Sequence, residues 1–390
     1  MRLGCFVVFG VGLALLPVRV GAQSTEATKL PQYPTRYYTV YTDLPRDDAR
    51  EAAVRMTAMA EEYHRRTSDF AGKVTSRMPF FLHGSQRGYL ANGGREGTAG
   101  YFDGSKLVAF AGDAGRPDLR TWNTVQHEGF HQFAHATMGQ AMPAWVDEGL
   151  AEYFGEAVFT GDGYVSGVIP GWRAKRIKQR MEQDGFVSTA ALRAWTLAEW
   201  NARLDGANYD QAWSMVQFLA HAENGRYRKA FAAYLNEVAA GRPRDRAWRQ
   251  HFGDDAGFER AWRAWWLSLP TDPTERLYVQ AWTEMLTSYL ARAASQKQAF
   301  GDFEAFLTAL DAGTVRHHPD DWLPPSLAAT AVDRVRAERE RIGIEWSLGI
   351  NGRLPTVVCT FADGSRMVGR FTLTGGRVGK VTVTEAAARP

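Results

Sequence analysis

The segment from His127 to Phe154 contains side chains that could bind a metal ion and use it in catalysis. It begins with His-Glu-x-x-His, in which His127 and His131 are four residues apart. On a helix this spacing puts both imidazoles on one face, close enough to hold one ion. Glu128, between them, is the natural general base for a water molecule that attacks a carbonyl group. The motif therefore predicts a catalytic zinc site with one Zn²⁺ per chain.

A catalytic zinc needs a third protein ligand and leaves a fourth position open for water. The longer metzincin pattern fails, because Thr137 stands where its third histidine would be. His135 would lie about 80° around the helix from His127, so that one ion could hardly reach all three imidazoles. We interpret His135 as a histidine of the core or one that supports a ligand. Glu148 follows a proline on a second helix, and a short antiparallel connection can place it opposite the histidine pair. It is the predicted third ligand.

The sequence around these ligands resembles a known group of enzymes. From Gln126 to Phe154 the chain contains HEGFH and then PAWVDEGLAEYF. This combination is similar to the gluzincin metallopeptidases, in which the zinc glutamate lies on a second helix in a W-x-x-E-G-x-A context. It more closely resembles the uncharacterised peptidase-MA-like family called domain of unknown function 1570, with a looser similarity from Tyr37 to Leu219. The resemblance implies a zinc-dependent peptidase that acts on a peptide or protein substrate.

The resemblance also implies roles for residues around the metal. Gluzincins carry an oxyanion-stabilising tyrosine at the start of a downstream helix, and Tyr209 stands in a comparable place. They also lend an edge strand to an extended substrate, which implies this role for residues 100–102 or 106–111, although a supporting hairpin is an equal alternative. The G-x-M-E-N strand of the aminopeptidases has no counterpart here, because residues 97–102 include no acidic side chain. Aminopeptidase specificity is therefore not implied, and an endopeptidase or an amidase acting on a cell-wall peptide would use the same chemistry.

Further polar residues could support this site or form another one. Carboxylates usually orient zinc-binding histidines, and Glu152, one turn after Glu148, is the best-spaced candidate. Asp147 is less well placed, and a solvated helix face would explain it equally well. His317 and His318 could suggest a second metal, but a histidine pair in a loop before a proline is more typical of polar surface.

The elements that must position these residues can be read from hydrophobic periodicity and turn signals. The metal helix is expected to start at a cap formed by Asp118 or Thr121 and to end at Gly139. Before it, we expect a helix that ends near Arg66 and strands at residues 37–42, 79–82, 100–102 and 106–111. After it, helices are expected at residues 172–181, 190–200, 209–221, 226–239 and 256–269, and more helix over 274–340. After these helices, the alternation of apolar and polar residues predicts strands at 344–348, 356–361, 366–373 and 377–384.

These expectations define an α+β fold. It comprises a small N-terminal mixed sheet, the zincin HExxH helix, a mostly α-helical C-terminal part and a small antiparallel β module at the end. The predicted parts are a signal peptide (1–22), an N-terminal α+β subdomain (23–117), a zincin catalytic helical subdomain (118–222), a helical domain (223–342) and the β module (343–390). The tryptophans at helical spacing could be taken for a carbohydrate platform, but such residues are more often core.

Composition and charge limit the possible cellular locations of the protein and the partners that it could bind. An apolar run after Arg2 and a small-residue site at Ala22 predict a cleaved export signal, hence a secreted or periplasmic protein without stable membrane insertion. Removing Arg2 and Arg19 reduces the formal charge from +3 to +1, so no nucleic-acid partner is indicated. Only Cys359 remains after cleavage, which leaves no intramolecular disulfide. The alternative to a peptidase is a non-catalytic protein of zincin fold that binds a cell-envelope partner.

Overall fold

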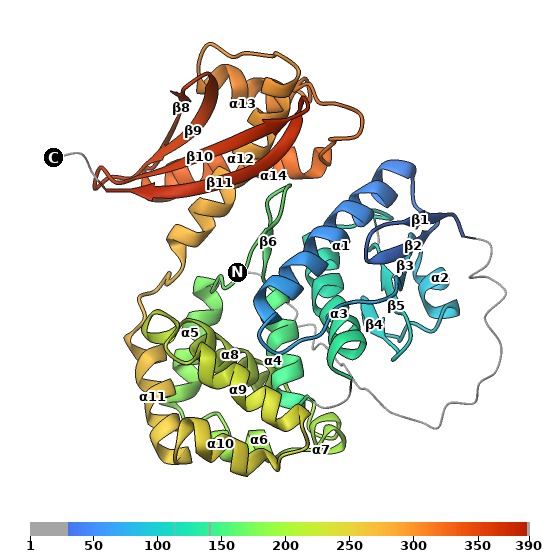
Figure 1. Cartoon of the computed structure of the whole chain (residues 1–390), viewed down its shortest axis with the longest axis vertical. Helices are drawn as coiled ribbons and strands as arrows, with labels where there is room; N and C mark the ends of the chain where they lie inside the picture. The colour runs from blue at the N-terminus through green and yellow to red at the C-terminus, as the bar shows by residue number, and fades with distance from the viewer. Residues whose placement is uncertain (1–29, 113, 140–141, 388–390) are drawn as a thin grey trace, which may run out of the picture. The chain divides into compact units, whose positions relative to one another are not determined.

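The computed structural model describes residues 30–112, 114–139 and 142–387. The chain forms two compact units, shown in Figure 1. The first unit comprises the chain up to Ala157 and the stretch Ile169–Pro273, and the second comprises Val158–Val168 and everything from Thr274. The predicted export signal at residues 1–22 lies outside the described residues. The finer division into domains that the sequence suggests stays a prediction.

The first unit begins with a mixed five-stranded sheet in the order β1-β2-β3-β5-β4. β2 and β3 are parallel, as are β3 and β5, whereas β1 and β4 pair antiparallel with their single neighbours. β4 is therefore an edge strand. The bounds are β1 Gln32–Pro34, β2 Tyr38–Thr42, β3 Met78–His83, β4 Gly100–Phe102 and β5 Leu107–Phe110, with the helices α1 Arg46–Thr67 and α2 Gln86–Ala91.

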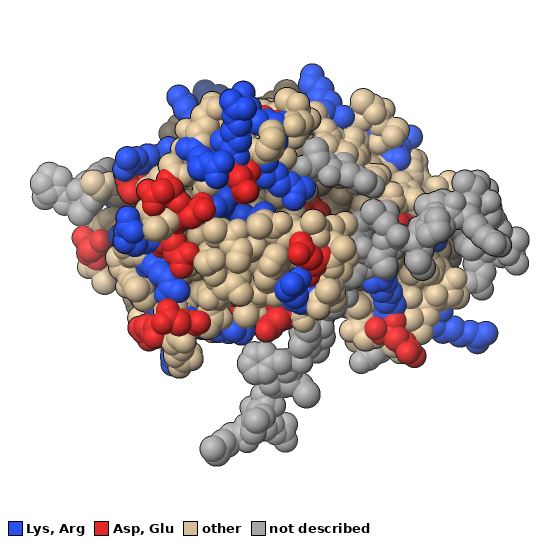
Figure 2. Space-filling model, turned by 90° about the horizontal axis from the view of Figure 1, so that it is seen from below, with Lys and Arg blue, Asp and Glu red and all other residues tan. Residues whose placement is uncertain are grey.

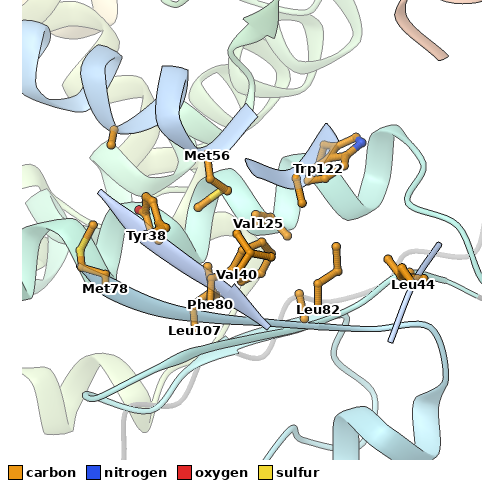
Figure 3. Packing of buried hydrophobic residues seen from close by; sticks show 14 residues of the cluster. Tyr38, Val40, Leu44, Met56, Met78, Phe80, Leu82, Leu107, Trp122 and Val125 are labelled. Atoms are coloured by element: carbon orange, nitrogen blue, oxygen red, sulfur yellow. The ribbon is translucent and has the colours of Figure 1, made fainter. Parts of the chain in front are cut away.

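One face of this sheet is buried against α1 and the helix that carries the two histidines, α3 (Leu119–Met138). Because side chains alternate along a strand, Tyr38 and Val40 of β2 point to the same face. Figure 3 shows this face packed against Met56 of α1 and Trp122 and Val125 of α3. This core fixes α3 beneath the sheet, which brings the HExxH residues close to the edge strand.

The remainder of the first unit is helical. Its elements are α3 Leu119–Met138, α4 Ala144–Gly155, α5 Gly171–Glu182, α6 Thr189–Ala194, α7 Leu197–Asn201, α8 Gly206–Gly225, α9 Arg228–Ala239, α10 Arg244–Phe252 and α11 Asp255–Ser268. α4 packs on both α3 and α8. Five tryptophans of this region are at most 1% exposed, which confirms that they belong to the core: Trp200, Trp213, Trp248, Trp262 and Trp266.

The second unit consists of an antiparallel sheet packed on the long helix α12. The sheet has the order β11-β10-β9-β8. A Cβ atom at Gly369 of β10 would lie 1.9 Å from Oγ1 of Thr287 on α12, so this glycine is where the sheet and the helix approach closely. The bounds are β6 Val158–Phe159, β7 Tyr164–Val165, α12 Glu275–Ser295, α13 Phe303–Asp311, α14 Pro325–Ile342, β8 Glu345–Asn351, β9 Leu354–Thr360, β10 Arg366–Thr374 and β11 Arg377–Ala386.

The β6–β7 hairpin joins the second unit, although it follows α4 directly in the sequence. Asp162 at its turn accepts two hydrogen bonds from the guanidinium of Arg292 on α12, at 2.8 and 2.9 Å. Gly161 leaves room for Leu323 and Ser288, because a Cβ atom there would lie 3.1 and 3.2 Å from their side chains. The chain therefore leaves the first unit after α4 and returns to it before α5.

The α+β fold class and most predicted elements are confirmed, with several differences. The expected helix over 190–200 is two helices, because Trp195 is extended (φ −59°, ψ 133°) and Thr196 starts α7 with a capping box to Glu199. β1, α2, the β6–β7 hairpin and α10 were not expected. The strands among them have only two or three residues, which gives no alternation to recognise.

Charges of both signs share the surface. On the face shown in Figure 2, Lys and Arg side chains are interspersed with Asp and Glu. Several exposed arginines form ion pairs, such as Arg226 with Glu223 at 2.6 Å. In the described part of the chain, the helices are too short or too polar to cross a membrane.

Candidate metal centre

Helix α3 carries the two histidines and is held at both ends by its own sequence. The Asp118 side chain accepts a hydrogen bond from the Thr121 N–H at 2.8 Å, which caps the first turn. Gly139 ends the helix at φ 63°, a conformation that favours glycine. Gly129 lets α1 approach, since a Cβ atom there would lie 3.0 Å from the Tyr63 hydroxyl. The predicted cap and stop are thus confirmed.

Helix α4 carries Glu148 and is held against α3 and α8. The Gln126 amide of α3 donates to the carbonyl oxygens of Phe154, Gly155 and Ala157 at 3.0 to 3.2 Å, which fixes the end of α4. On the opposite side, Gly149 allows close contact with α8. These contacts set the position of α4 along α3, and hence the position of Glu148 relative to the histidines.

Three ligand atoms converge where the helices face each other. Nε2 of His127 lies 3.2 Å from Nε2 of His131, and Glu148 Oε2 lies 3.6 and 3.5 Å from these two atoms. Tetrahedral Zn²⁺ has bonds of about 2.0–2.1 Å to nitrogen and oxygen, which implies separations of about 3.3–3.4 Å between its ligands. The three residues are 4% to 7% exposed. This group could hold a metal ion.

The buried polar atoms of the group also fit a metal. Glu148 Oε2 is buried, and within the described residues no hydrogen-bond donor is aligned with it. A buried carboxylate oxygen without a donor is costly unless a cation compensates it. The donor set of two imidazoles and one carboxylate is that of known catalytic zinc sites. The described residues therefore fit a zinc ion, although they do not identify the metal.

Each of the two histidines has a carboxylate close to its Nδ1 atom. Nδ1 of His127 lies 3.3 Å from Glu152 Oε1, as the spacing predicted. Nδ1 of His131 lies 3.2 Å from Asp147 Oδ2, so the prediction that Asp147 is less well placed was wrong. Asp147 is in the first turn of α4, and the antiparallel crossing turns that end of the helix toward His131. Both carboxylates lie within ion-pair distance of an Nδ1 atom, on the side of each ring opposite the Nε2 atoms that face Glu148.

The carboxylates strongly favour charge on the histidines when no metal is bound. Burial disfavours the charged form of His127, but its interactions with the nearby carboxylates of Glu148 and Glu152 outweigh this effect and raise its pKa to about 9. The pKa of His131 is likewise raised well above its usual value, because Asp147 and Glu148 outweigh the effect of burial. Because a metal binds neutral imidazole, metal binding would release protons from this group.

Glu128, the residue after His127 on α3, contacts the edge strand β4. Its carboxylate Oε2 accepts a hydrogen bond from the Phe102 N–H of β4 at 3.0 Å, and the residue is 2% exposed. Gly100 makes this approach possible, since a Cβ atom there would lie 2.7 Å from Thr124 Cγ2 and 3.4 Å from Glu128 Cγ. The backbone of β4 thus fixes the direction in which the Glu128 carboxylate points.

Tyr209 is buried in the first turns of α8, the helix that packs on α4. Burial, followed by the charge of Glu148, raises the pKa of its hydroxyl far above the usual value. Its ring lies edge-on to Trp200, with centroids 5.4 Å apart. The hydroxyl therefore stays protonated and can only act as a hydrogen-bond donor or acceptor, not as a base.

The other histidines of interest do not join the group. His135 is exposed in the last turn of α3, so its interpretation as a core or ligand-supporting residue was wrong. Its ring packs edge-on against Phe102, with centroids 5.7 Å apart. His317 is exposed and His318 is partly exposed, in keeping with polar surface.

One residue near the site was not anticipated. Arg173 on α5 is 3% exposed, and its three guanidinium nitrogens bind Glu152, Glu156 and Asp210. The sequence signal for it is its position in the buried stripe of α5, together with Ile177 and Met181 at four-residue spacing. An arginine in an apolar stripe must be paired when it is buried.

The comparisons with known proteins agree with the site but name no activity. Residues 121–245 match the model of a family described as protein of unknown function (DUF1570). The match includes the two histidines, Glu128, Glu148 and Tyr209. No curated protein matches the chain. The family match covers the metal group and the helices that pack around it.

Proposed function

We propose that this protein is a zinc-dependent hydrolase that cleaves peptide bonds. The observation that carries the proposal is the convergence of His127 Nε2, His131 Nε2 and Glu148 Oε2 at mutual distances of 3.2 to 3.6 Å. Glu128 follows His127 directly, in the order that zinc hydrolases use for a general base. The similarity to gluzincin peptidases in the HEGFH and WVDEGLAEYF segments supports the same activity.

The roles of the side chains follow from their chemistry. When bound, zinc would polarise the substrate carbonyl and lower the pKa of water. The Glu128 carboxylate takes a proton from the attacking water and passes it to the leaving nitrogen. The Tyr209 hydroxyl donates a hydrogen bond to the developing oxyanion. Glu152 and Asp147 keep the two imidazole rings in their ligand orientation.

The edge strand β4 supports an extended peptide as the substrate. The Ala99 carbonyl accepts a hydrogen bond from the Phe110 N–H of β5, and the Asp103 N–H donates to the carbonyl of Lys106, the residue before β5. Alternation along the strand therefore directs the N–H and C=O groups of Gly100 and Phe102 away from β5. Phe102 N–H already donates to Glu128, so a chain pairing with β4 would run past the general base. Given the export signal expected at residues 1–22, peptides of the cell envelope are the substrates to test first.

The test combines metal content with activity. Purified wild-type protein should contain about one zinc per chain by mass spectrometry, and Glu148→Ala should lose most of it. Glu128→Gln should keep the zinc and the fold, measured by circular dichroism, but hydrolyse a fluorogenic peptide library at least about 100-fold more slowly.

Two outcomes would contradict this proposal. A folded wild-type protein that neither contains zinc nor binds added zinc would exclude the metal site. A Glu128→Gln variant with undiminished hydrolysis would exclude Glu128 as the base. A zinc protein that cleaves no peptide but retains an envelope protein or peptidoglycan in a pulldown would favour the binding function instead.

A further inference from the structure

We propose that Arg173 is a positioning residue of the metal centre, which holds the Glu152 carboxylate against His127. This inference rests on the proposed zinc site but concerns a residue outside the HExxH and WVDEGLAEYF segments. Arg173 lies on α5, which the chain reaches only after the β6–β7 hairpin.

The first observation is that the two carboxylate oxygens of Glu152 contact different residues. Its Oε1 lies 3.3 Å from Nδ1 of His127, and its Oε2 lies 2.5 Å from Nη2 of Arg173. One carboxylate therefore bridges the ligand and the guanidinium. Because both oxygens are occupied, the carboxylate cannot rotate away from the imidazole without breaking a charged hydrogen bond.

The second observation is that other contacts hold the guanidinium of Arg173 in place. Nη1 binds Glu156 at 2.8 Å and Nε lies 3.2 Å from Asp210 Oδ1. The guanidinium carbon lies 4.0 Å from the centroid of the Trp213 ring. Glu152 belongs to α4 and Glu156 is the residue that caps the end of this helix, while Asp210 and Trp213 belong to α8. The planar fork of one arginine thus joins two helices at a fixed distance, which the single ammonium of a lysine could not do.

The third observation is the comparison with Arg176, one turn further along α5. Its Nη2 also binds Asp210, at 2.5 Å, but it makes no ion pair with Glu152 or Glu156 among the described residues. Its side chain is 30% exposed, against 4% for Arg173. Arg176 shares the helix and one partner, but not the link to His127. It is therefore a matched control.

The experiment measures zinc affinity by competition with a chromophoric chelator. Residues that support a zinc ligand typically change metal affinity by about 10–100-fold. We expect Arg173→Lys and Glu152→Gln each to weaken zinc binding by at least about tenfold, and Arg176→Lys to leave it within about threefold of wild type. Arg173→Gln, which keeps a planar N–H donor, is the second variant should Arg173→Lys fail to fold.

Two further readouts separate positioning from general stability. If Arg173 acts through Glu152, the double variant should bind zinc no more weakly than Glu152→Gln alone, whereas independent effects would add. The visible absorption spectrum of the Co²⁺-loaded protein should also change in Arg173→Lys and not in Arg176→Lys, because it reports ligand geometry.

The outcomes are distinguishable from those that test the hydrolase proposal. An Arg173→Lys variant with wild-type zinc affinity and an unchanged cobalt spectrum would overturn the positioning role alone. Additive losses in the double variant would also overturn it, because Arg173 would then act independently of Glu152. A wild-type protein that binds no zinc would overturn both proposals together.

Discussion

Gly149 lies so close to Ala212 that a Cβ atom on the glycine would come within 2.7 Å of the Ala212 carbonyl oxygen. The same atom would lie 2.8 Å from Val216 Cγ2. Real Cβ atoms do not approach backbone atoms so closely, so a side chain here would push α4 away from α8. The displaced helix would carry the neighbouring ligand, Glu148, with it.

We therefore expect Gly149→Ala to lower both stability and metal affinity. Overpacking of a buried helix contact typically costs about 1–3 kcal/mol. Urea unfolding with chelator present should show this loss, and chelator competition should show weaker zinc binding. Gly206→Ala is the control, because nothing lies within 4 Å of a Cβ atom at that helical position. Equal stability of Gly149→Ala and wild type would show that α4 and α8 can separate without cost.

Replacing Tyr209 by phenylalanine should reduce turnover while zinc affinity stays unchanged. The variant keeps the ring against Trp200 but removes the hydroxyl that would donate to the oxyanion. Removal of one oxyanion donor costs about 100–1,000-fold in kcat. Tyr234→Phe is the control, since Tyr234 is buried in α9 outside the site. A Tyr209→Phe variant with wild-type kcat would exclude Tyr209 as the oxyanion donor.

His221 should make the fold less stable in mild acid. Its ring stacks on Tyr153, with Nε2 3.1 Å from the hydroxyl. Burial, helped by the charges of Arg66 and Arg228, lowers its pKa to about 4. Between about pH 6.5 and 4 the unfolded chain binds a proton at His221 that the folded chain does not bind. The free energy of unfolding therefore decreases as the pH is lowered through this range, by up to about 3 kcal/mol.

The measurement compares the metal-free wild type with His221→Phe by urea unfolding from pH 7.5 to 4. The variant keeps a ring for the stack but has no group that titrates. We expect the difference between the two proteins to change with pH in this window, in favour of the variant at low pH. Parallel pH profiles would contradict the assignment.

In the second unit, Gly369→Ala should be destabilising. The added Cβ atom would meet Oγ1 of Thr287, which already donates to the Thr283 carbonyl at 2.6 Å inside the core. Thr287 is completely buried, so it has little freedom to move aside, and a loss of about 1–3 kcal/mol is expected. Gly301→Ala, with nothing within 4 Å, should leave the melting temperature nearly unchanged.

The parts of the site that lie close together in sequence could be predicted from it. The four-residue spacing of His127 and His131 is a property of any helix, and a single short loop separates Glu148 from them. Asp147 could not be judged, because whether it faces His131 depends on the rotation of α4, which Gln126 and Gly149 fix through contacts with other segments. Periodicity describes one helix and not its rotation against the next.

The contacts of Arg173 could not be predicted for the same reason, and its partners are further away in the sequence. Its carboxylate partners lie 17 to 37 residues away on two other helices. The sequence reveals only that an arginine stands in a buried stripe, and several acidic residues could satisfy it. The fold class was predictable because each element carries its own pattern, whereas this ion-pair cluster exists only once three helices are assembled.

The β6–β7 hairpin makes the first unit, which contains the candidate metal centre, inseparable from the C-terminal part of the chain. A protein cut after Pro273 would retain residues 158–168 but lose α12, whose Arg292 binds Asp162. The hairpin would then present Phe159 and Tyr164, both now buried, to water. Forms of the protein that are shortened at this point are thus expected to aggregate unless the hairpin is also replaced by a short polar loop. Recombination in evolution would face the same constraint.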